Sequence, residues 1–137
     1  MRYLVLVEGS QADYDALRGK GSADSAAWSE EDLRAMSAHM GALGDDLAGS
    51  GELVDAQGLA EPARSRHVTL GADGKAVIDD GPYGLTEVLP AGYWVLECAS
   101  LERVTEIAER IARCPQPAGA PGRPVVIRPI VDGSADL

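Results

Sequence analysis

Two helix patterns, each between apolar runs of strand length, constrain the fold of this 137-residue chain more than any other feature. The first helix is expected to begin after Ser29, because Ser29 and Asp32 have the spacing of a capping box. The glycines at 49 and 51 should end it. Apolar side chains recur every three or four residues between these limits, so the helix has one apolar face. They are Leu33, Met36, Met40, Leu43 and Leu47.

The second helix is expected to follow Ser100 and to end at Cys114-Pro115, because the residue before a proline disfavours helical backbone angles. Its apolar side is formed by Leu101, Val104, Ala108 and Ile111. A glycine-containing polar stretch, residues 9–21, is expected to hold a single helical turn around Tyr14 and Leu17 and to be mobile or a lid.

The strand predictions follow from short apolar or alternating runs. Residues 3–7 are apolar without alternation, which is typical of an interior strand. Ala72-Asp73-Gly74 has the composition of a hairpin turn. Pro129 cannot donate to a neighbouring strand, so the last strand should lie at an edge. The predicted strands are residues 3–7, 52–59, 65–70, 75–78, 92–98 and 125–131.

This order predicts a single α+β domain over residues 1–131, of the ferredoxin-like kind, with an extra β-hairpin and a disordered tail at 132–137. Two helices can cover only one face of the sheet. Because the inner strands are apolar on both sides, the other face would be a large exposed apolar patch. Pairing with a second copy is the simplest remedy, so we expect a homodimer.

The net charge and the cysteine content limit which partners and which kinds of site are expected. The formal net charge of −10 repels phosphate backbones and anionic membranes, so nucleic acid and membrane are not expected partners. Cys98 and Cys114 lack the spacing of a zinc site or a disulfide framework and should be reduced. The first apolar run is too short for a signal peptide, which favours the cytoplasm. No cofactor or metal is expected.

Asp80-Gly81-Pro82-Tyr83 resembles the motif of the YCII-related family, specifically its DGPF branch, with Tyr83 in place of the final Phe. The resemblance extends along nearly the whole chain. It includes the first strand, a helix that ends in Gly before a Leu-Val strand, the strand start Gly92-Tyr93-Trp94, the Cys114-Pro115 helix end and the final Arg128-Pro129-Ile130.

The resemblance implies a fold similar to the dimeric α+β barrels, in which two ferredoxin-like sheets face each other and enclose a cleft. Most members have no assigned activity; a His-Asp pair has been proposed as the active site in some, and many DGPF genes neighbour alternative sigma-factor genes. This chain departs from its branch after the motif, where Leu85 and Val88 occupy positions that are usually acidic.

The candidate site residues follow from these observations. His39 borders the apolar face of the first helix and could act as an acid or base, oriented by Asp55 or Asp80. Asp80 and Tyr83 could be presented to a ligand by a rigid motif turn, although that turn also has a purely structural explanation. His67 is expected to be solvated. The two histidines have no partner at ligand spacing, so a metal site is not expected.

Two functions remain open. The first is a small-molecule enzyme or binding protein with a cleft between sheet and motif loop at the dimer barrel, using His39 and Asp80 catalytically and Tyr83 and Asp55 to bind substrate. The second is a noncatalytic accessory or regulatory protein associated with a sigma-factor system. If the first holds, His39 should face a solvent-reachable pocket within hydrogen-bond distance of a carboxylate.

Overall fold

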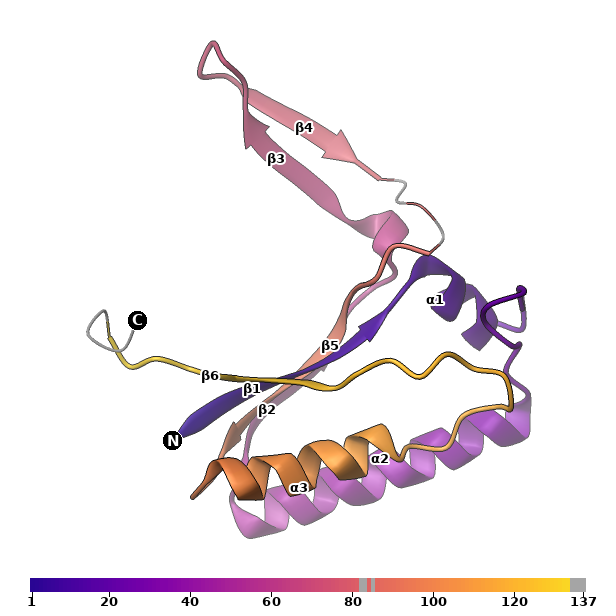
Figure 1. Cartoon of the computed structure of the whole chain (residues 1–137), viewed down its shortest axis with the longest axis vertical. Helices are drawn as coiled ribbons and strands as arrows, with labels where there is room; N and C mark the ends of the chain where they lie inside the picture. The colour runs from indigo at the N-terminus through magenta and orange to yellow at the C-terminus, as the bar shows by residue number, and fades with distance from the viewer. Residues whose placement is uncertain (82–83, 85, 134–137) are drawn as a thin grey trace.

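The computed structural model describes residues 1–81, 84 and 86–133. Within them the chain forms an α+β fold, in which a layer of helices packs on a four-stranded antiparallel sheet (Figure 1). The strand order is β2-β5-β1-β6. Helices α2 and α3 lie together along one side of this sheet (Figure 1). The bounds are β1 (Arg2–Gly9), α2 (Glu30–Ser50), β2 (Leu53–Gly58), β5 (Leu89–Glu97), α3 (Leu101–Ala112) and β6 (Val126–Pro129).

The connections confirm the predicted pair of strand–helix–strand units. The units are β1-α2-β2 and β5-α3-β6. In the sheet, β5 lies between the two strands of the first unit, and β1 lies between the two strands of the second. All neighbouring strands therefore run antiparallel. This order is compatible with a ferredoxin-like fold. As predicted, β1 is an interior strand and β6, which contains Pro129, lies at an edge.

Local signals set the helix ends. The Asp32 backbone N–H donates to Ser29 Oγ at 3.1 Å, and the Ser29 N–H donates to the Asp32 carboxylate at 2.9 Å, which is the predicted capping box. Gly51 ends α2 with a φ of 78°, a left-handed conformation that glycine adopts without steric cost. Ser100 caps α3 by accepting from the Arg103 N–H at 3.1 Å.

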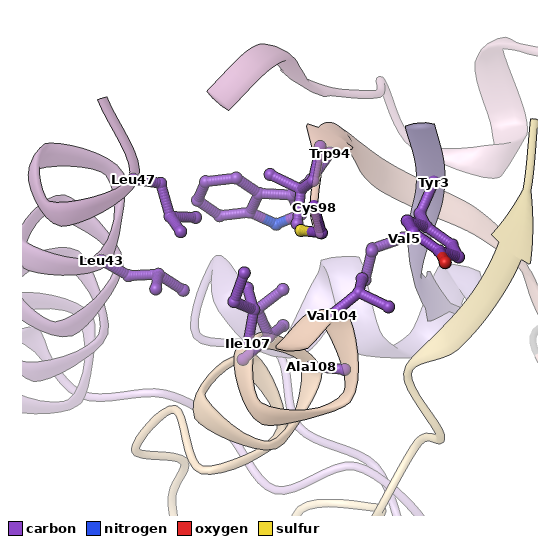
Figure 2. Close-up of a cluster of buried hydrophobic side chains, with 11 residues drawn as sticks. Tyr3, Val5, Leu43, Leu47, Trp94, Cys98, Val104, Ile107 and Ala108 are labelled. Carbon is purple, nitrogen blue, oxygen red and sulfur yellow. The ribbon is translucent and has the colours of Figure 1, made fainter. Parts of the chain in front are cut away.

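The core lies between the sheet and these two helices (Figure 2). Trp94 projects from β5 into this core. Its neighbours there are mostly aliphatic, because the chain contains no Phe. Close packing without voids is what makes such a core stabilising. The members with no exposed surface are Val5, Leu43, Leu47, Leu96, Val104 and Ile107.

The polar stretch after β1 is more ordered than predicted. It forms α1 (Gln11–Leu17), a helix with its own capping box between Ser10 and Asp13. Ala12 and Ala16 are 6% and 1% exposed, and Tyr14 Oη donates to the Leu59 backbone oxygen at 2.8 Å. The helix is longer than the single turn predicted, because Ser10 and Asp13 cap it and the small side chains of Ala12 and Ala16 let it pack closely.

The hairpin forms as predicted from β3 (Arg66–Leu70) and β4 (Ala76–Asp80), and it projects away from the rest of the molecule (Figure 1). A short 3-10 helix, η1 (Pro62–Arg64), precedes it. One face of the hairpin is apolar, because Val68 pairs with Ile78 and Leu70 with Ala76. Val68, Leu70 and Ile78 are 61%, 76% and 58% exposed, so this face has nothing to pack against within the described residues.

A bidentate ion pair joins Glu52, the residue before β2, to α3. Arg103 donates from Nε and Nη2 to the two carboxylate oxygens of Glu52 at 2.9 and 2.8 Å. These hydrogen bonds outweigh the effect of burial and lower the pKa of Glu52 from 4.5 to about 2. Because the folded-state pKa is depressed, the resulting stability is present above pH 4.5 and is lost as the pH falls toward 2.

The Arg103–Glu52 pair should contribute a pH-dependent part of the stability. Replacing Arg103 by Met should lower the free energy of unfolding at pH 7 by roughly 1 kcal/mol, because a partly exposed pair is screened by solvent. The deficit should shrink as the pH approaches 2, where Glu52 is protonated in the native protein too. Urea denaturation at a series of pH values measures both effects. A deficit that stayed constant over that range would contradict the role given to Glu52.

Candidate functional site

His39 lies in the helical layer and is not paired with a carboxylate in the described part of the structure. It projects from α2, half-buried, with its Nε2 2.7 Å from the backbone oxygen of Arg110 on α3. A carbonyl oxygen only accepts, so the imidazole donates through Nε2. The bond ties the two helices together, which is the structural role open to a histidine at the border of an apolar face.

Asp80 lies at the end of β4, where it closes the base of the hairpin. Its Oδ1 and Oδ2 accept from Arg66 Nε at 2.5 Å and Nη2 at 2.9 Å. The hairpin and α2 are at opposite ends of the molecule in Figure 1, so the structure does not bring Asp80 and His39 together. The candidate Tyr83 lies outside the described residues.

Asp55 lies on the face of the sheet that the helices do not cover. Its Oδ2 accepts from Tyr93 Oη at 3.1 Å, and its Oδ1 accepts from Gln57 Nε2 at 3.2 Å. Asp55 and Gln57 come from the edge strand β2, and Tyr93 comes from the neighbouring β5. Asp55 therefore cannot orient His39, which belongs to the layer on the other side.

The strand register places this polar trio in an otherwise apolar surface, which we call the open face. Val95 pairs with both Leu4 and Asp55, and Tyr93 pairs with both Leu6 and Gln57. Directly opposite residues of neighbouring strands project to the same side. The helix-covered face carries the buried Tyr3, Val5, Trp94 and Leu96. On the open face, by contrast, the apolar residues are only half-buried: Leu4, Leu6, Tyr93, Val95 and Val126.

Tyr93 and Gln57 are functional candidates that the sequence pattern did not predict, and Tyr93 is the donor to Asp55 with a shifted pKa. The hydrogen bond to Asp55, with smaller contributions from burial and from the negative charge of Asp55, raises the pKa of Tyr93 above 10. The phenol therefore stays protonated at neutral pH and acts as a hydrogen-bond donor, not as a base. Alternation along residues 92–98 could have revealed its position, since it puts Tyr93 on the opposite face from Trp94.

The remaining candidates form no cluster. His67 lies in the exposed hairpin. Cys98 is buried and Cys114 half-buried, and both are free thiols. Nowhere in residues 1–81, 84 or 86–133 do three or more histidine, cysteine or acidic side chains come together as metal ligands would. Within the same ranges, no helix combines the length and the apolar character that crossing a membrane requires.

A family model described as the YCII-related domain matches residues 1–125. The matched region contains the open face up to the start of β6, and the whole helical layer and hairpin. No curated protein matches the chain.

Proposed function

The chain belongs to the YCII-related family, and from that premise we propose that it is a homodimer whose two open faces enclose a cleft for a small molecule. The observation that carries this proposal is the Asp55–Tyr93–Gln57 trio set in an uncovered apolar face. The motif at residues 80–83 supports placing the chain in the DGPF branch, and the strand order supports the dimeric α+β barrel.

The apolar side chains of the open face favour a second copy of the chain as the partner that packs on it. The interior strands β1 and β5 present half-buried apolar side chains there, and an exposed apolar surface of this kind is typical of an interface. A two-fold axis makes the same surface serve both partners, so no second complementary patch is needed. The exposed apolar face of the hairpin adds further surface that a second copy could cover.

Charge at the two edges of the open face supports an overlay in which β2 of each copy lies over β6 of the other. Arg128, Leu4, Val95 and Asp55 stand in one row across the face. Arg128 is exposed at the β6 edge, and Asp55 lies at the β2 edge. A two-fold axis parallel to the strands would bring Arg128 of each copy near Asp55 of the other, so opposite charges would meet at both ends.

The hydrogen-bonding groups of the trio determine which chemical class of ligand the cleft would bind. Gln57 and Tyr93 both donate to Asp55, which uses two of the four lone pairs of the carboxylate, and within the described residues nothing donates to the amide oxygen of Gln57. These groups accept hydrogen bonds, so they suit a ligand that carries a hydroxyl or amine on an apolar body. Because His39 and Asp80 are each engaged elsewhere, we propose binding through the trio; a catalytic role for either residue, and a cytoplasmic location, stay predictions.

Removing the Tyr93 hydroxyl tests the site. A thermal-shift screen of small aromatic and carboxylic metabolites, including hydroxyl- and amine-bearing ones, should give compounds that stabilise the native dimer. In the Asp55→Asn variant the dissociation constant should rise by about tenfold or more, because the ligand loses its hydrogen bond to a charged group. Tyr93→Phe should also raise it, because Asp55 loses the hydrogen bond that orients it. Tyr3→Phe is the matched control, because Tyr3 lies on the helix-covered face of the same sheet. Compounds that bind all variants equally would refute the proposed site.

A noncatalytic accessory role, in a sigma-factor system as the resemblance suggests, is the second candidate. The observation that favours it is the hairpin, whose Val68, Leu70 and Ile78 are 61%, 76% and 58% exposed. A partner protein would cover this face as an apolar docking surface. The absence of any stabilising compound in the screen would shift weight to this function.

A further inference from the structure

A cavity of about 260 Å³ lies inside a single chain, away from the trio of the open face. It is formed by α1, the first half of α2, the end of α3 and the connector from Cys114 to Val125, and we call it the α1 cavity. Its walls are largely apolar and include Leu17, Trp28, Met36, Met40, Ile111 and Val125. Cavities for drug-sized ligands occupy about 300–1,000 Å³, so this one suits a smaller molecule with one ring.

One carboxylate holds the polar end of the α1 cavity together. Asp13 accepts from Arg123 Nε at 2.9 Å and Nη2 at 3.2 Å, from Ser25 Oγ at 2.7 Å and from the Ser10 N–H at 3.0 Å. Ser10 and Ser25 are 1% and 2% exposed. These bonds fasten the segment after α1 and the connector before β6 to the same helix, so the cavity is preformed.

The protonation state of Asp13 follows from these contacts. Burial alone would raise its pKa, but the hydrogen bonds from Arg123, Ser10 and Ser25 and the positive charge of Arg123 together lower the pKa below 3.8. Asp13 is therefore ionised at neutral pH and balances the charge of Arg123. Its four lone pairs are all used, which leaves none for a ligand.

The Nη1 donor of Arg123 and the charges around the α1 cavity indicate which class of ligand would bind there. Arg123 Nη1 donates no hydrogen bond to another residue in the described ranges, although its neighbours Nε and Nη2 do. Glu8 also lines the cavity, so its net charge is negative and an anion is disfavoured. We propose that the α1 cavity binds an uncharged, one-ring apolar molecule whose carbonyl or hydroxyl oxygen accepts from Arg123 Nη1.

Matched ring compounds test the charge preference. Acetophenone and 4-methylphenol are uncharged probes, and benzoate and benzylammonium carry opposite charges on a similar ring. Titration followed by protein NMR should show saturable binding of both uncharged probes, with dissociation constants at least about tenfold lower than those of the charged pair. Equal or tighter binding of either ion would overturn the proposed ligand class. No saturable binding of any probe would overturn the site.

Filling the cavity locates the binding. Ala120 lines the α1 cavity, whereas Ala118 is exposed two residues away in the same connector and does not line it. Ala120→Trp should abolish binding of acetophenone, and Ala118→Trp should leave its dissociation constant unchanged. Binding that survives Ala120→Trp in a folded protein would place the probe elsewhere and refute the assignment.

The two cysteines provide an independent readout in the native sequence. Cys114 lines the α1 cavity, whereas Cys98 is 2% exposed and belongs to the core. Saturating acetophenone should slow alkylation of Cys114 by iodoacetamide severalfold, as measured by peptide mass spectrometry, and an unchanged rate would count against the site. Tyr93→Phe should not alter this protection, so failure here and failure of the open-face site are distinguishable.

Discussion

Leu6→Glu is expected to convert the proposed dimer into monomers. Leu6 lies near the centre of the open face on the interior strand β1, where it pairs with Tyr93 on one side and Val126 on the other. In the dimer a glutamate there would be an unpaired buried charge, which costs roughly 3–5 kcal/mol. That cost corresponds to a weakening of the dimer by more than ~100-fold.

Light scattering coupled to size-exclusion chromatography measures the change directly. The native chain should elute as a dimer at micromolar concentration and Leu6→Glu as a monomer with an unchanged far-ultraviolet circular dichroism spectrum, because Leu6 is not part of the helix-covered core. Leu101→Glu makes the same substitution at a 54% exposed position of α3 and should leave the dimer intact. A monomeric native protein, or a dimeric Leu6→Glu variant, would refute the barrel arrangement.

The largest expected loss of stability is that of Leu47→Ala. Leu47 has no exposed surface and belongs to the same cluster as Leu43, Trp94 and Ile107, packed against the sheet from α2 (Figure 2). Truncation removes buried methyl groups and leaves a cavity that a rigid β-sheet cannot collapse to fill. Such substitutions lower the free energy of unfolding by roughly 2–5 kcal/mol.

Urea denaturation at constant protein concentration measures this loss, since the stability of a dimer depends on concentration. Leu101→Ala is the control, because the same side chain is removed from a helix position that is 54% exposed. Its effect should stay within about 0.5 kcal/mol. Similar losses in both variants would mean that burial in this core does not determine stability.

The elements of the fold could be predicted because their signals are local. Ser29 with Asp32 marks a helix start, Asp73-Gly74 marks a hairpin turn, and Pro129 marks an edge strand. Each of these acts within a few residues along the chain. The same logic applied to Ser10 and Asp13 would have predicted α1.

The candidate site could not be predicted in the same way, because it depends on which layer and which register each residue occupies. His39 and Asp55 are separated by the sheet, a fact that neither helix periodicity nor strand alternation contains. Asp55 meets Tyr93 only because a register shift between Leu53 and Asp55 aligns β2 with β5 as it does. Pairings between distant strands are set by tertiary packing.

The projecting hairpin is expected to unfold separately from the main sheet and its helices. Among the described residues its two strands form a sheet separate from the four-stranded one, and a lone two-stranded ribbon is marginally stable in water. Opening it would leave the main sheet and its helices in place, so its backbone amides can exchange without global unfolding. The turn at residues 71–75 is therefore the natural position for an inserted tag, or for a first protease cut, that spares the folded body.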